Sequence, residues 1–285
     1  MSLLLDEIAI ATARLAEAGV ESPRTDAEII AARLHGVSRG QLHLVPDTGF
    51  DPRFWDDIAR REAREPLQHI TGVAHFRYLE LTVGPGVFVP RPETEVMTGW
   101  AIDQLAAMDV AEPVVADLGT GSGAIALAIA QEVPRALVHA VEADPLASAW
   151  AERNIAGVGR AAPHTAGRVT LHRSDFASAL ADLDGRVDLV VSNPPYIPVG
   201  AWVPPEVGEY DPATALWGGA DGMDAVRVVE ATAARLLRPD GLVAVEHGAQ
   251  QGAAVYWVFA DASWLDPRNH ADLAGRDRFV TARRR

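Results

Sequence analysis

The spacing of apolar residues changes several times along this chain of 285 residues. Near the start, Leu4, Ile8, Ala11 and Leu15 recur at helical spacing, and Gly19 follows as a stop signal. This pattern predicts an amphipathic helix that ends shortly before Gly19.

Two more helices are expected before residue 73. Thr25-Asp26-Ala27-Glu28 predicts a capping box for a helix that passes through Leu34 and is closed by Gly36. Asp51-Pro52 predicts the start of another helix, with Ile58 on its apolar face. Residues 1–72 are therefore predicted to form a small helical domain.

From Val73 the pattern changes to short aromatic and β-branched runs, interrupted by Gly84-Pro85-Gly86. These runs predict a β-hairpin linker over residues 73–92. Pro90 and Pro92 fix a bent approach to a helix that passes through Leu105. The remaining residues, 93–285, are predicted to form the main domain.

After Pro113, strand-like and helix-like segments alternate along the chain. The segments are Val114–Leu118, Ala124–Gln131, Leu137–Val141, Pro145–Asn154, Val169–His172, Val187–Ser192, Ala225–Leu237 and Leu242–Glu246. Such alternation predicts an α/β domain in which helices cover both faces of a parallel sheet. The final Arg283-Arg284-Arg285 is expected to be a solvated end.

Composition narrows the possible chemistry. The chain has no cysteine, which excludes disulfides, thiolate nucleophiles and cysteine-bound zinc, and no metal site is expected. All 25 basic residues are arginine, which excludes a Schiff-base lysine and the lysine of a phosphate-binding loop. The longest apolar runs are too short for a membrane span, and the first residues do not resemble a signal peptide. A soluble, cytoplasmic monomer is expected.

The charge disfavours a nucleic-acid partner. The formal net charge is −14, and the first 90 residues contain nine arginines against thirteen acidic residues. Affinity for nucleic acid comes largely from cations that neutralise phosphates. A protein or small-molecule partner without direct nucleic-acid binding is therefore favoured.

A glycine-rich turn predicts a nucleotide-like cofactor. Gly119 to Gly123 join a predicted strand to a helix, and Glu142 ends the next strand about twenty residues on, where a ribose-binding carboxylate is needed. Dinucleotide and S-adenosylmethionine sites share this arrangement. Here the glycine spacing is G-x-G-x-G, and Asp117 before it would oppose a phosphate but suit the amino end of S-adenosylmethionine. A purely structural tight turn remains the alternative.

Asp175 and Phe176 follow the third predicted strand, where they could contact adenine through a hydrogen bond and a ring. A strand-end acid beside a core phenylalanine explains the pair equally well. The complete set predicted to bind the cofactor is Asp117, Gly119, Thr120, Gly121, Ser122, Gly123, Glu142, Asp175, Phe176 and Asn193.

Asn193-Pro194-Pro195-Tyr196 follows a continuous apolar run. We expect it to hold the nitrogen that accepts a methyl group from S-adenosylmethionine. An amide nitrogen is a poor nucleophile, so its NH₂ group must be held while positive charge develops. The Asn193 side-chain oxygen and the Pro194 carbonyl can each accept one N–H, and consecutive prolines restrict that carbonyl. Tyr196 would stack on the planar group. Asn193, Pro194 and Tyr196 are the predicted catalytic residues, and no general base is required.

Three other interpretations fit parts of the pattern. Asn193–Tyr196 could be only a strand-ending turn. DNA adenine methyltransferases use a similar tetrapeptide on a flipped base, but they generally need a basic recognition surface. A binding module could keep the fold without turnover, although Asn193 and Tyr196 are intact here.

Taken together, these residues resemble the HemK/PrmC family, bacterial methyltransferases that act on glutamine in peptide chain release factors. The resemblance covers nearly the whole chain. It is carried by Val87–Glu95, Asp117–Gly123, Glu142, Asn193–Tyr196, Glu246-His247-Gly248 and Gln250-Gln251.

The resemblance implies a seven-stranded Rossmann-like methyltransferase fold, S-adenosylmethionine as donor and the glutamine of a Gly-Gly-Gln loop as acceptor. Arg91, Glu93 and Asn193–Tyr196 are then the predicted substrate-binding residues, including Pro195, and the helical domain would dock the protein substrate. Some relatives carry tryptophan where Phe176 stands. A related branch methylates a ribosomal protein but usually lacks the sequence motif found here at Arg91–Glu95. Release factors are therefore favoured as the substrate.

Overall fold

The computed structural model describes residues 3–46 and 51–285, and the chain divides into two compact units. A helical unit contains the chain up to Val73 together with Val203–Tyr210. A sheet unit contains Ala74–Trp202 and Asp211–Arg285. Among the described residues, no helix combines the length and apolar character that crossing a membrane requires.

The helical unit is built around one apolar core. Its helices are α1 (Leu3–Glu17), α2 (Pro23–Leu34), the 3₁₀ helix η1 (Arg39–Leu44), α3 (Arg53–Glu62), α4 (Leu67–Thr71) and α8 (Pro205–Gly208). Ile8, Leu15, Ile30, Phe54 and Ile58 are almost fully buried in this core. The helical spacing therefore predicted α1, α2 and α3, but not the shorter helices η1, α4 and α8.

The predicted capping box of α2 is wrong. The helix begins at Pro23 with Ser22 at its N-cap, so Thr25 already lies inside the first turn. Proline suits the first helical position because its ring presets φ and no N–H is needed there. Asp26 is buried instead, and its Oδ2 accepts a hydrogen bond of 2.8 Å from Nε of Arg61.

A short segment far along the chain belongs to the helical unit. Arg61 and Arg64 both form ion pairs with Glu206, at 3.0 and 2.6 Å. The Tyr210 hydroxyl donates to the carbonyl of Ala63 at 2.8 Å. No local pattern predicts this assignment, because it depends on contacts across more than 140 residues.

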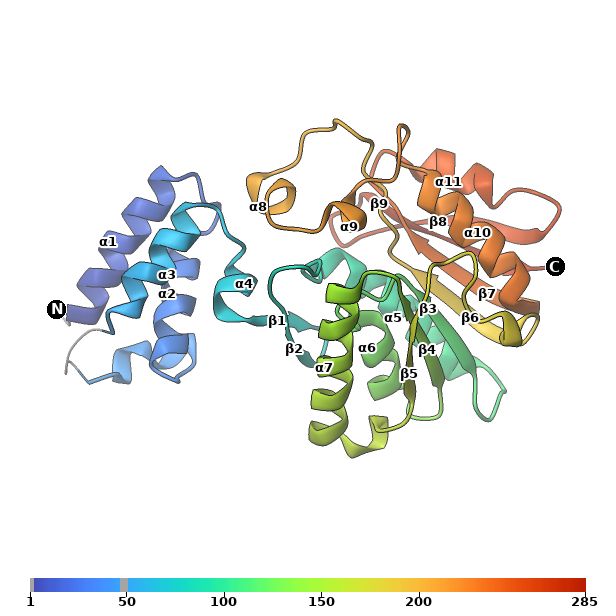
Figure 1. The fold of residues 1–285 in the computed structure, drawn as a ribbon, viewed down its shortest axis with the longest axis horizontal. Helices are drawn as coiled ribbons and strands as arrows, with labels where there is room; N and C mark the ends of the chain where they lie inside the picture. Colours follow the sequence, from blue (N-terminus) through green and yellow to red (C-terminus); the bar gives the residue numbers. More distant parts are fainter. Residues whose placement is uncertain (1–2, 47–50) are drawn as a thin grey trace. The chain divides into compact units, whose positions relative to one another are not determined.

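The sheet unit contains a two-stranded hairpin and a seven-stranded sheet (Figure 1). Its strands are β1 (Val73–Phe76), β2 (Leu79–Thr82), β3 (Val114–Leu118), β4 (Leu137–Glu142), β5 (Val169–Arg173), β6 (Val187–Ser192), β7 (Leu237–Glu246), β8 (Trp264–Ala271) and β9 (Asp277–Arg284). Its helices are α5 (Pro92–Ala107), α6 (Ala124–Glu132), α7 (Pro145–Ala161), α9 (Ala213–Leu216), α10 (Asp224–Leu236) and α11 (Gly252–Val258), with short 3₁₀ turns η2 (Pro163–Thr165) and η3 (Ala181–Leu183).

The seven-stranded α/β fold is confirmed, but the sheet is mixed. Its strand order is β5-β4-β3-β6-β7-β9-β8, and the last two strands run antiparallel to their neighbours. The expected solvated arginine end is wrong, because Arg283 and Arg284 lie in β9 and pair with β7 and β8. Residues 279–282 of β9 are all buried, and the arginines that follow them hide this strand from a linear hydrophobic pattern.

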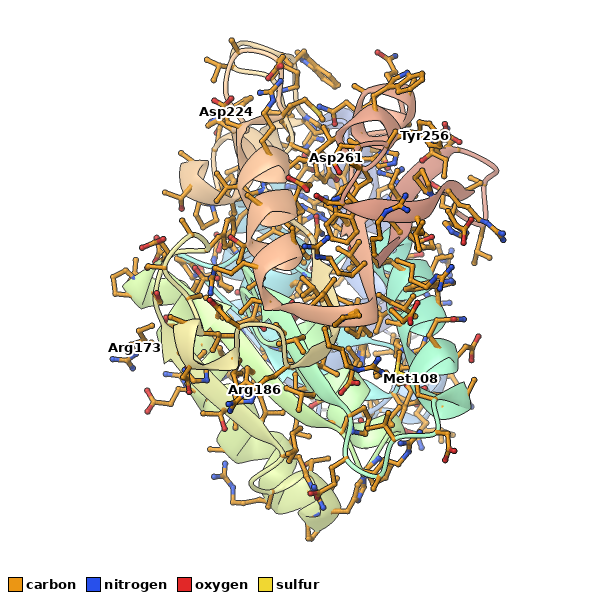
Figure 2. All side chains as sticks on the ribbon, turned by 90° about the vertical axis from the view of Figure 1, so that its right-hand side faces the viewer. Met108, Arg173, Arg186, Asp224, Tyr256 and Asp261 are labelled. Carbon is orange, nitrogen blue, oxygen red and sulfur yellow. The ribbon has the colours of Figure 1, made fainter. Side chains whose placement is uncertain are left out.

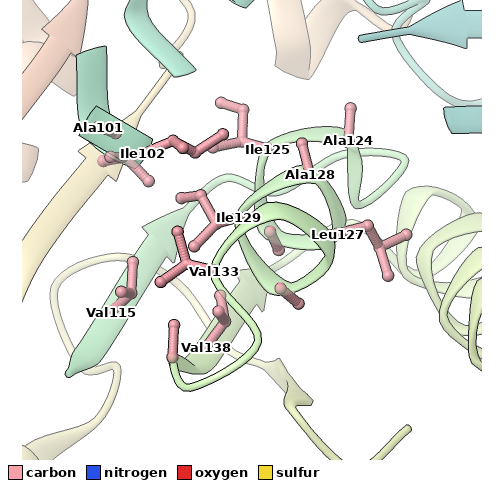
Figure 3. Close-up of a cluster of buried hydrophobic side chains, with 14 of the residues drawn as sticks. Ala101, Ile102, Val115, Ala124, Ile125, Leu127, Ala128, Ile129, Val133 and Val138 are labelled. Atoms are coloured by element: carbon pink, nitrogen blue, oxygen red, sulfur yellow. The ribbon is translucent and has the colours of Figure 1, made fainter. Parts of the chain in front are cut away.

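Two apolar layers cover the sheet. Helices α5, α6 and α7 cover one face, where Val115 and Val138 of the sheet share a buried cluster with Ile129 of α6 (Figure 3). Helices α10 and α11 cover the other face over Ala116 and Val190. Successive strand residues face opposite layers, as the two-residue period of a strand requires. Figure 2 shows exposed charged side chains such as Arg173, Asp224 and Asp261 at the outside of this unit. The chemistry must therefore lie at the strand ends.

Candidate active site

The two motifs singled out in the sequence lie side by side. The chain runs outward through β3, β4 and β5 and then returns to place β6 against the free side of β3. Leu118 of β3 pairs with Ser192 of β6, and the Ser192 hydroxyl donates to the Leu118 carbonyl at 2.6 Å. The next residues are Gly119 and Asn193. Ligands of such sheets bind at this reversal of strand order, beyond the carboxyl ends of the strands.

A cavity of about 500 Å³ opens at this position, entirely within the sheet unit. This size is typical of small-molecule and cofactor sites. Its lining includes residues from the glycine turn, the strand ends and the loop after β6, namely Phe76, Phe88, Pro90, Arg91, Thr94, Gly119, Thr120, Gly121, Ser122, Glu142, Asp144, Asp175, Phe176, Asn193, Pro195, Tyr196, Ile197, Pro212 and Leu216. Predicted residues Asp117, Gly123, Glu93 and Pro194 are not part of this lining.

The glycine turn has a backbone that other residues rarely adopt. Gly119, Gly121 and Gly123 have φ values of 79°, 57° and 85°. A Cβ atom on Gly119 would lie 3.1 Å from the ring of Phe176, so this glycine also allows the ring to approach the turn. Glycine is required here both for conformation and for space.

Glu142 is the last residue of β4 and lies at the cavity wall. Its carboxylate accepts hydrogen bonds of 2.9 Å from the N–H groups of Gly121 and Asp144. Burial raises the pKa of Glu142, and these backbone donors oppose part of the rise. The carboxylate is thus fixed beside the glycine turn, where it can accept hydrogen bonds from the hydroxyls of a ribose.

Asp117 lies beneath the turn and is fully buried. Its Oδ2 accepts hydrogen bonds from the Thr120 hydroxyl at 2.6 Å and from the N–H of Ala126 at 3.1 Å. Its Oδ1 has no hydrogen-bond partner. Burial raises the pKa of Asp117 to about 7, and the charge of nearby Glu142 adds to the rise. The Asp117 side chain therefore holds the glycine turn in place through its hydrogen bonds to Thr120 and Ala126.

Asp175 and Phe176 both line the cavity. Asp175 is exposed, and its carboxylate accepts hydrogen bonds from the N–H and the hydroxyl of Ser178. The ring of Phe176 lies against Gly119, as the Cβ distance shows. An apolar ring and a carboxylate thus border the same part of the cavity.

Asn193 and Tyr196 lie on the other side of the cavity. Asn193 Nδ2 donates to Thr94 Oγ1 at 3.2 Å, and the Tyr196 hydroxyl donates to Glu246 Oε1 at 3.4 Å. Burial raises the pKa of Tyr196, so its hydroxyl stays a donor at neutral pH. Pro194 is buried, whereas Pro195 borders the cavity.

The backbone after Asn193 is braced by residues that are distant in sequence. Gln251 Nε2 donates to the Tyr196 carbonyl at 2.9 Å, and Gln251 Oε1 accepts from the N–H of Gly248 at 2.9 Å. Ile197 extends the brace, because it exchanges backbone hydrogen bonds with Leu216 and Gly218. The tetrapeptide is therefore held from both sides.

Arg91 and Glu93 differ in their placement. Arg91 lines the cavity, its guanidinium lies 4.9 Å from the ring of Phe88, and it pairs with Asp211 at 2.7 Å. Burial raises the pKa of Asp211 to about 6, although Arg91 opposes the rise. Glu93 is exposed, and the next residue, Thr94, borders the cavity instead.

Sequence reasoning did not assign roles to Thr94, Asp211, Glu246 and Gln251. Thr94, Glu246 and Gln251 belong to motifs of the family resemblance, but those motifs gave them no individual role. Glu246 is 1% exposed, and its Oε2 has no hydrogen-bond partner. Burial raises its pKa to about 7, and hydrogen bonding from Thr94 partly offsets the rise. These residues contribute through contacts with residues that are distant in sequence, and a local sequence pattern does not contain such contacts.

The arrangement can hold a cofactor on one side and a planar nitrogen on the other. The glycine turn, Glu142 and Phe176 fit a nucleoside, because they offer backbone access, a carboxylate and a ring. Asn193 and Tyr196 offer a hydrogen-bond acceptor and an aromatic face. Arg91, the arginine that lines the cavity, is already paired with Asp211.

Comparison with known proteins agrees with this geometry. Residues 8–72 match the model of the PrmC N-terminal domain, and residues 80–202 match that of the methyltransferase small domain. The chain is 60% identical over 287 residues to the release factor glutamine methyltransferase of Streptomyces coelicolor, covering 100% of this chain and 99% of that protein.

One further relative and one solved structure carry names that give other acceptors. The chain is 40% identical over 267 residues to the 4-amino-L-phenylalanine/4-methylamino-L-phenylalanine methyltransferase of Streptomyces pristinaespiralis, covering 91% of this chain and 87% of that protein. The 16S rRNA N2 G1207 methyltransferase of T. Thermophilus, solved in complex with AdoMet and guanosine, matches with a TM-score of 0.51 and 22% identity, over 75% of this chain and 50% of that one. This structural likeness supports the fold.

Proposed function

Because this chain belongs to the family of release factor glutamine methyltransferases, we propose that it methylates the side-chain amide nitrogen of a glutamine in a peptide chain release factor. The cofactor is S-adenosylmethionine, which supplies an electrophilic methyl group on a sulfonium. The acceptor is the glutamine of the Gly-Gly-Gln loop. The observation that carries the proposal is the pairing of Leu118 with Ser192, which makes the cofactor turn and Asn193 neighbours.

The residues of the cavity fit this cofactor. Gly119 and Gly121 allow the methionine end to approach the backbone, and Glu142 can accept hydrogen bonds from the ribose hydroxyls. Phe176 offers an apolar ring to the adenine, and Asp175 an acceptor for its amino group. Glu142 is already held beside the turn by the N–H groups of Gly121 and Asp144, and its carboxylate has further lone pairs that can accept from the ribose hydroxyls.

Asn193 and Tyr196 orient the acceptor. The Asn193 side-chain oxygen accepts one N–H of the glutamine amide, and the family resemblance assigns the other N–H to the carbonyl of Pro194, although Pro194 itself is buried outside the cavity lining. Tyr196 stacks on the amide plane and excludes water. A C–N bond forms while the S–C bond of the donor breaks, and the nitrogen then releases one proton to solvent. Since the methylated nitrogen is strongly acidic, no general base is needed.

The helical unit has the role of docking the release factor. A single glutamine side chain supplies little binding energy, so the remainder must come from a second surface. The negative charge of the chain, −14 overall, also favours a protein substrate over a polyanion.

A competition assay with labelled S-adenosylmethionine tests the proposal. The purified chain is given a release factor, 4-aminophenylalanine and duplex DNA together, and the label in each is counted. Label in the release factor is expected, and a release factor with alanine in place of the loop glutamine should receive none. Label found mainly in the amino acid or in DNA would overturn the proposal.

A further inference from the structure

Asn154 is a buried polar residue that takes part in no step of the proposed reaction. It lies in the second half of α7, is 3% exposed and does not line the cavity. Its side-chain amide nevertheless joins two segments of the sheet unit by hydrogen bonds. One segment is the end of β2 at Thr82, and the other is the glycine turn at Ser122.

The partners of Asn154 fix the direction of its amide. Its Oδ1 accepts from the N–H of Thr82 at 2.8 Å and from the Thr82 hydroxyl at 2.7 Å. Its Nδ2 donates to the Thr82 carbonyl at 3.0 Å and to the Ser122 carbonyl at 2.9 Å. A backbone N–H can only donate and a carbonyl oxygen can only accept, so a reversed amide would lose these bonds. The Nδ2 group therefore has to face the Ser122 carbonyl.

The Ser122 carbonyl belongs to the part of the turn that borders the cavity. Ser122 and its neighbour Gly121 both line the cavity. The N–H of Gly123, which shares a peptide unit with that carbonyl, donates to the Thr120 carbonyl at 2.9 Å. Because a peptide unit is planar, its two ends cannot rotate independently. Asn154 thus fixes the plane of the peptide that closes the glycine turn.

The same face of α7 contacts the turn and the hairpin linker at other points. Residues three and four apart lie on one face of a helix. Ala151 is close enough to Gly123 that a Cβ atom on this glycine would lie 3.8 Å from it. Trp150 Nε1 donates to the Pro85 carbonyl of the linker at 3.2 Å. Helix α7 is therefore a support for both segments, and Asn154 supplies its hydrogen bond to the turn.

We propose that Asn154 is a positioning residue for S-adenosylmethionine, because it holds the Ser122 carbonyl and so keeps the glycine turn in the conformation that receives the cofactor. Asn154 acts through the turn and does not touch the cofactor. The proposal concerns cofactor binding alone, so it does not depend on which acceptor is methylated.

Asn154→Asp tests the proposal with little change in shape. The oxygen that replaces Nδ2 would face the carbonyls of Thr82 and Ser122, where a donor is required. We expect the affinity for S-adenosylmethionine to fall about tenfold, as the loss of a buried hydrogen bond at a binding turn does, while kcat at saturating cofactor stays within about twofold. Calorimetry and steady-state kinetics measure the two quantities, at temperatures where circular dichroism shows each variant to be folded. Asn154→Ala should lower the affinity in the same direction and replaces N154D if that variant does not fold.

Thr165 provides a matched control near the end of the same helix. It is 4% exposed, and its hydroxyl donates to the Ala162 carbonyl at 2.8 Å. Thr165→Val therefore removes a buried hydrogen bond without touching the glycine turn. Its melting temperature should fall, whereas its affinity for S-adenosylmethionine should stay within about twofold of that of the unmodified protein. An N154D protein that binds the cofactor normally, or a T165V protein that loses as much affinity as N154D, would overturn the proposal.

A second readout places the effect in the turn. The amide nitrogen of Gly123 is bonded to the Ser122 carbonyl carbon, so its NMR chemical shift reports on that peptide unit. In the cofactor-free protein this signal should move in N154D and stay in place in T165V. An unmoved signal in N154D would refute the proposal even if cofactor affinity fell. If the protein labels no release factor while cofactor affinity and this signal behave as expected, the proposed function fails and the positioning role of Asn154 stands.

Discussion

The two walls of the cavity are built in different ways. The cofactor wall comes from residues 119–176, which lie at or just after the ends of the consecutive strands β3, β4 and β5, and the Glu142 carboxylate accepts a hydrogen bond from the N–H of Gly121. The acceptor wall around Asn193 depends on side chains from α5, from the end of β7 and from the start of α11. The cofactor wall, which is local in sequence, should tolerate substitutions elsewhere in the chain. The acceptor wall is assembled from distant segments, so substitutions far from Asn193 should change its geometry.

The largest effect is expected at the acceptor wall itself. Asn193→Ala removes the side-chain acceptor and should lower kcat for release factor methylation about 1,000-fold, comparable to the loss of one preorganised hydrogen-bonding group. Calorimetry should give the same affinity for S-adenosylmethionine as the unmodified protein. An active N193A enzyme would remove the proposed role of this side chain.

Substitutions at two glycines would separate the walls. A Cβ atom on Gly218 would lie 2.5 Å from the Pro195 carbonyl, so G218A must shift the backbone beside the tetrapeptide. We expect kcat to fall about 30-fold with cofactor affinity unchanged, because small displacements of holding groups are costly.

Gly119→Ala should lower the affinity for the cofactor and leave kcat nearly unchanged, the reverse of what is expected for G218A. The new Cβ would meet the ring of Phe176 at 3.1 Å at a residue with positive φ. Cofactor affinity should fall about tenfold, which corresponds to roughly 1.4 kcal/mol, while kcat at saturating cofactor changes little. If both variants changed the same kinetic parameter, the two walls would not be separate.

Gln251 tests how far the acceptor wall extends. Gln251→Ala removes the link between the Tyr196 carbonyl and the N–H of Gly248. Losing both hydrogen bonds should lower kcat about tenfold and leave cofactor affinity unchanged. Steady-state kinetics with release factor as the variable substrate would measure this, and Gln250→Ala at the preceding exposed residue is the matched control.

The smallest effect is a pH dependence of stability on the cofactor side. An acid whose pKa is raised by folding, from about 4 to about 7 for Asp117, binds more protons in the native state than in the unfolded state between these values. Its contribution to stability is therefore present at low pH and is lost as pH rises through 7.

Asp117→Asn removes this titration, so the melting temperature of the variant relative to the unmodified protein should rise by a few degrees from pH 5 to pH 8. Asp221→Asn is the control, because an exposed carboxylate paired with Arg227 has a lowered pKa and should show no such trend in this range. A constant difference for D117N, measured by thermal unfolding at several pH values, would show that Asp117 does not titrate as described.

The local wall is also the one that sequence patterns described best. Backbone geometry fixes the number of residues between the strand that begins at Val114, the glycines with positive φ and Glu142. A linear sequence pattern can therefore reveal them. The same is true of Asn193 at the end of an apolar strand. The family resemblance and the seven-stranded fold, both expected from these residues, are confirmed.

Tertiary structure alone decided which side chains support Asn193 and Tyr196. Thr94 rather than Glu93 borders the cavity because of the rotation of α5, and Glu246 becomes a buried acceptor because β7 lies beside β6. Contacts between distant residues also decide that Val203–Tyr210 belongs to the helical unit. They decide likewise that β9 pairs between β7 and β8. Sequence patterns encode conformation and burial over short distances, whereas the orientation of a hydrogen bond depends on which distant partner the fold places beside it.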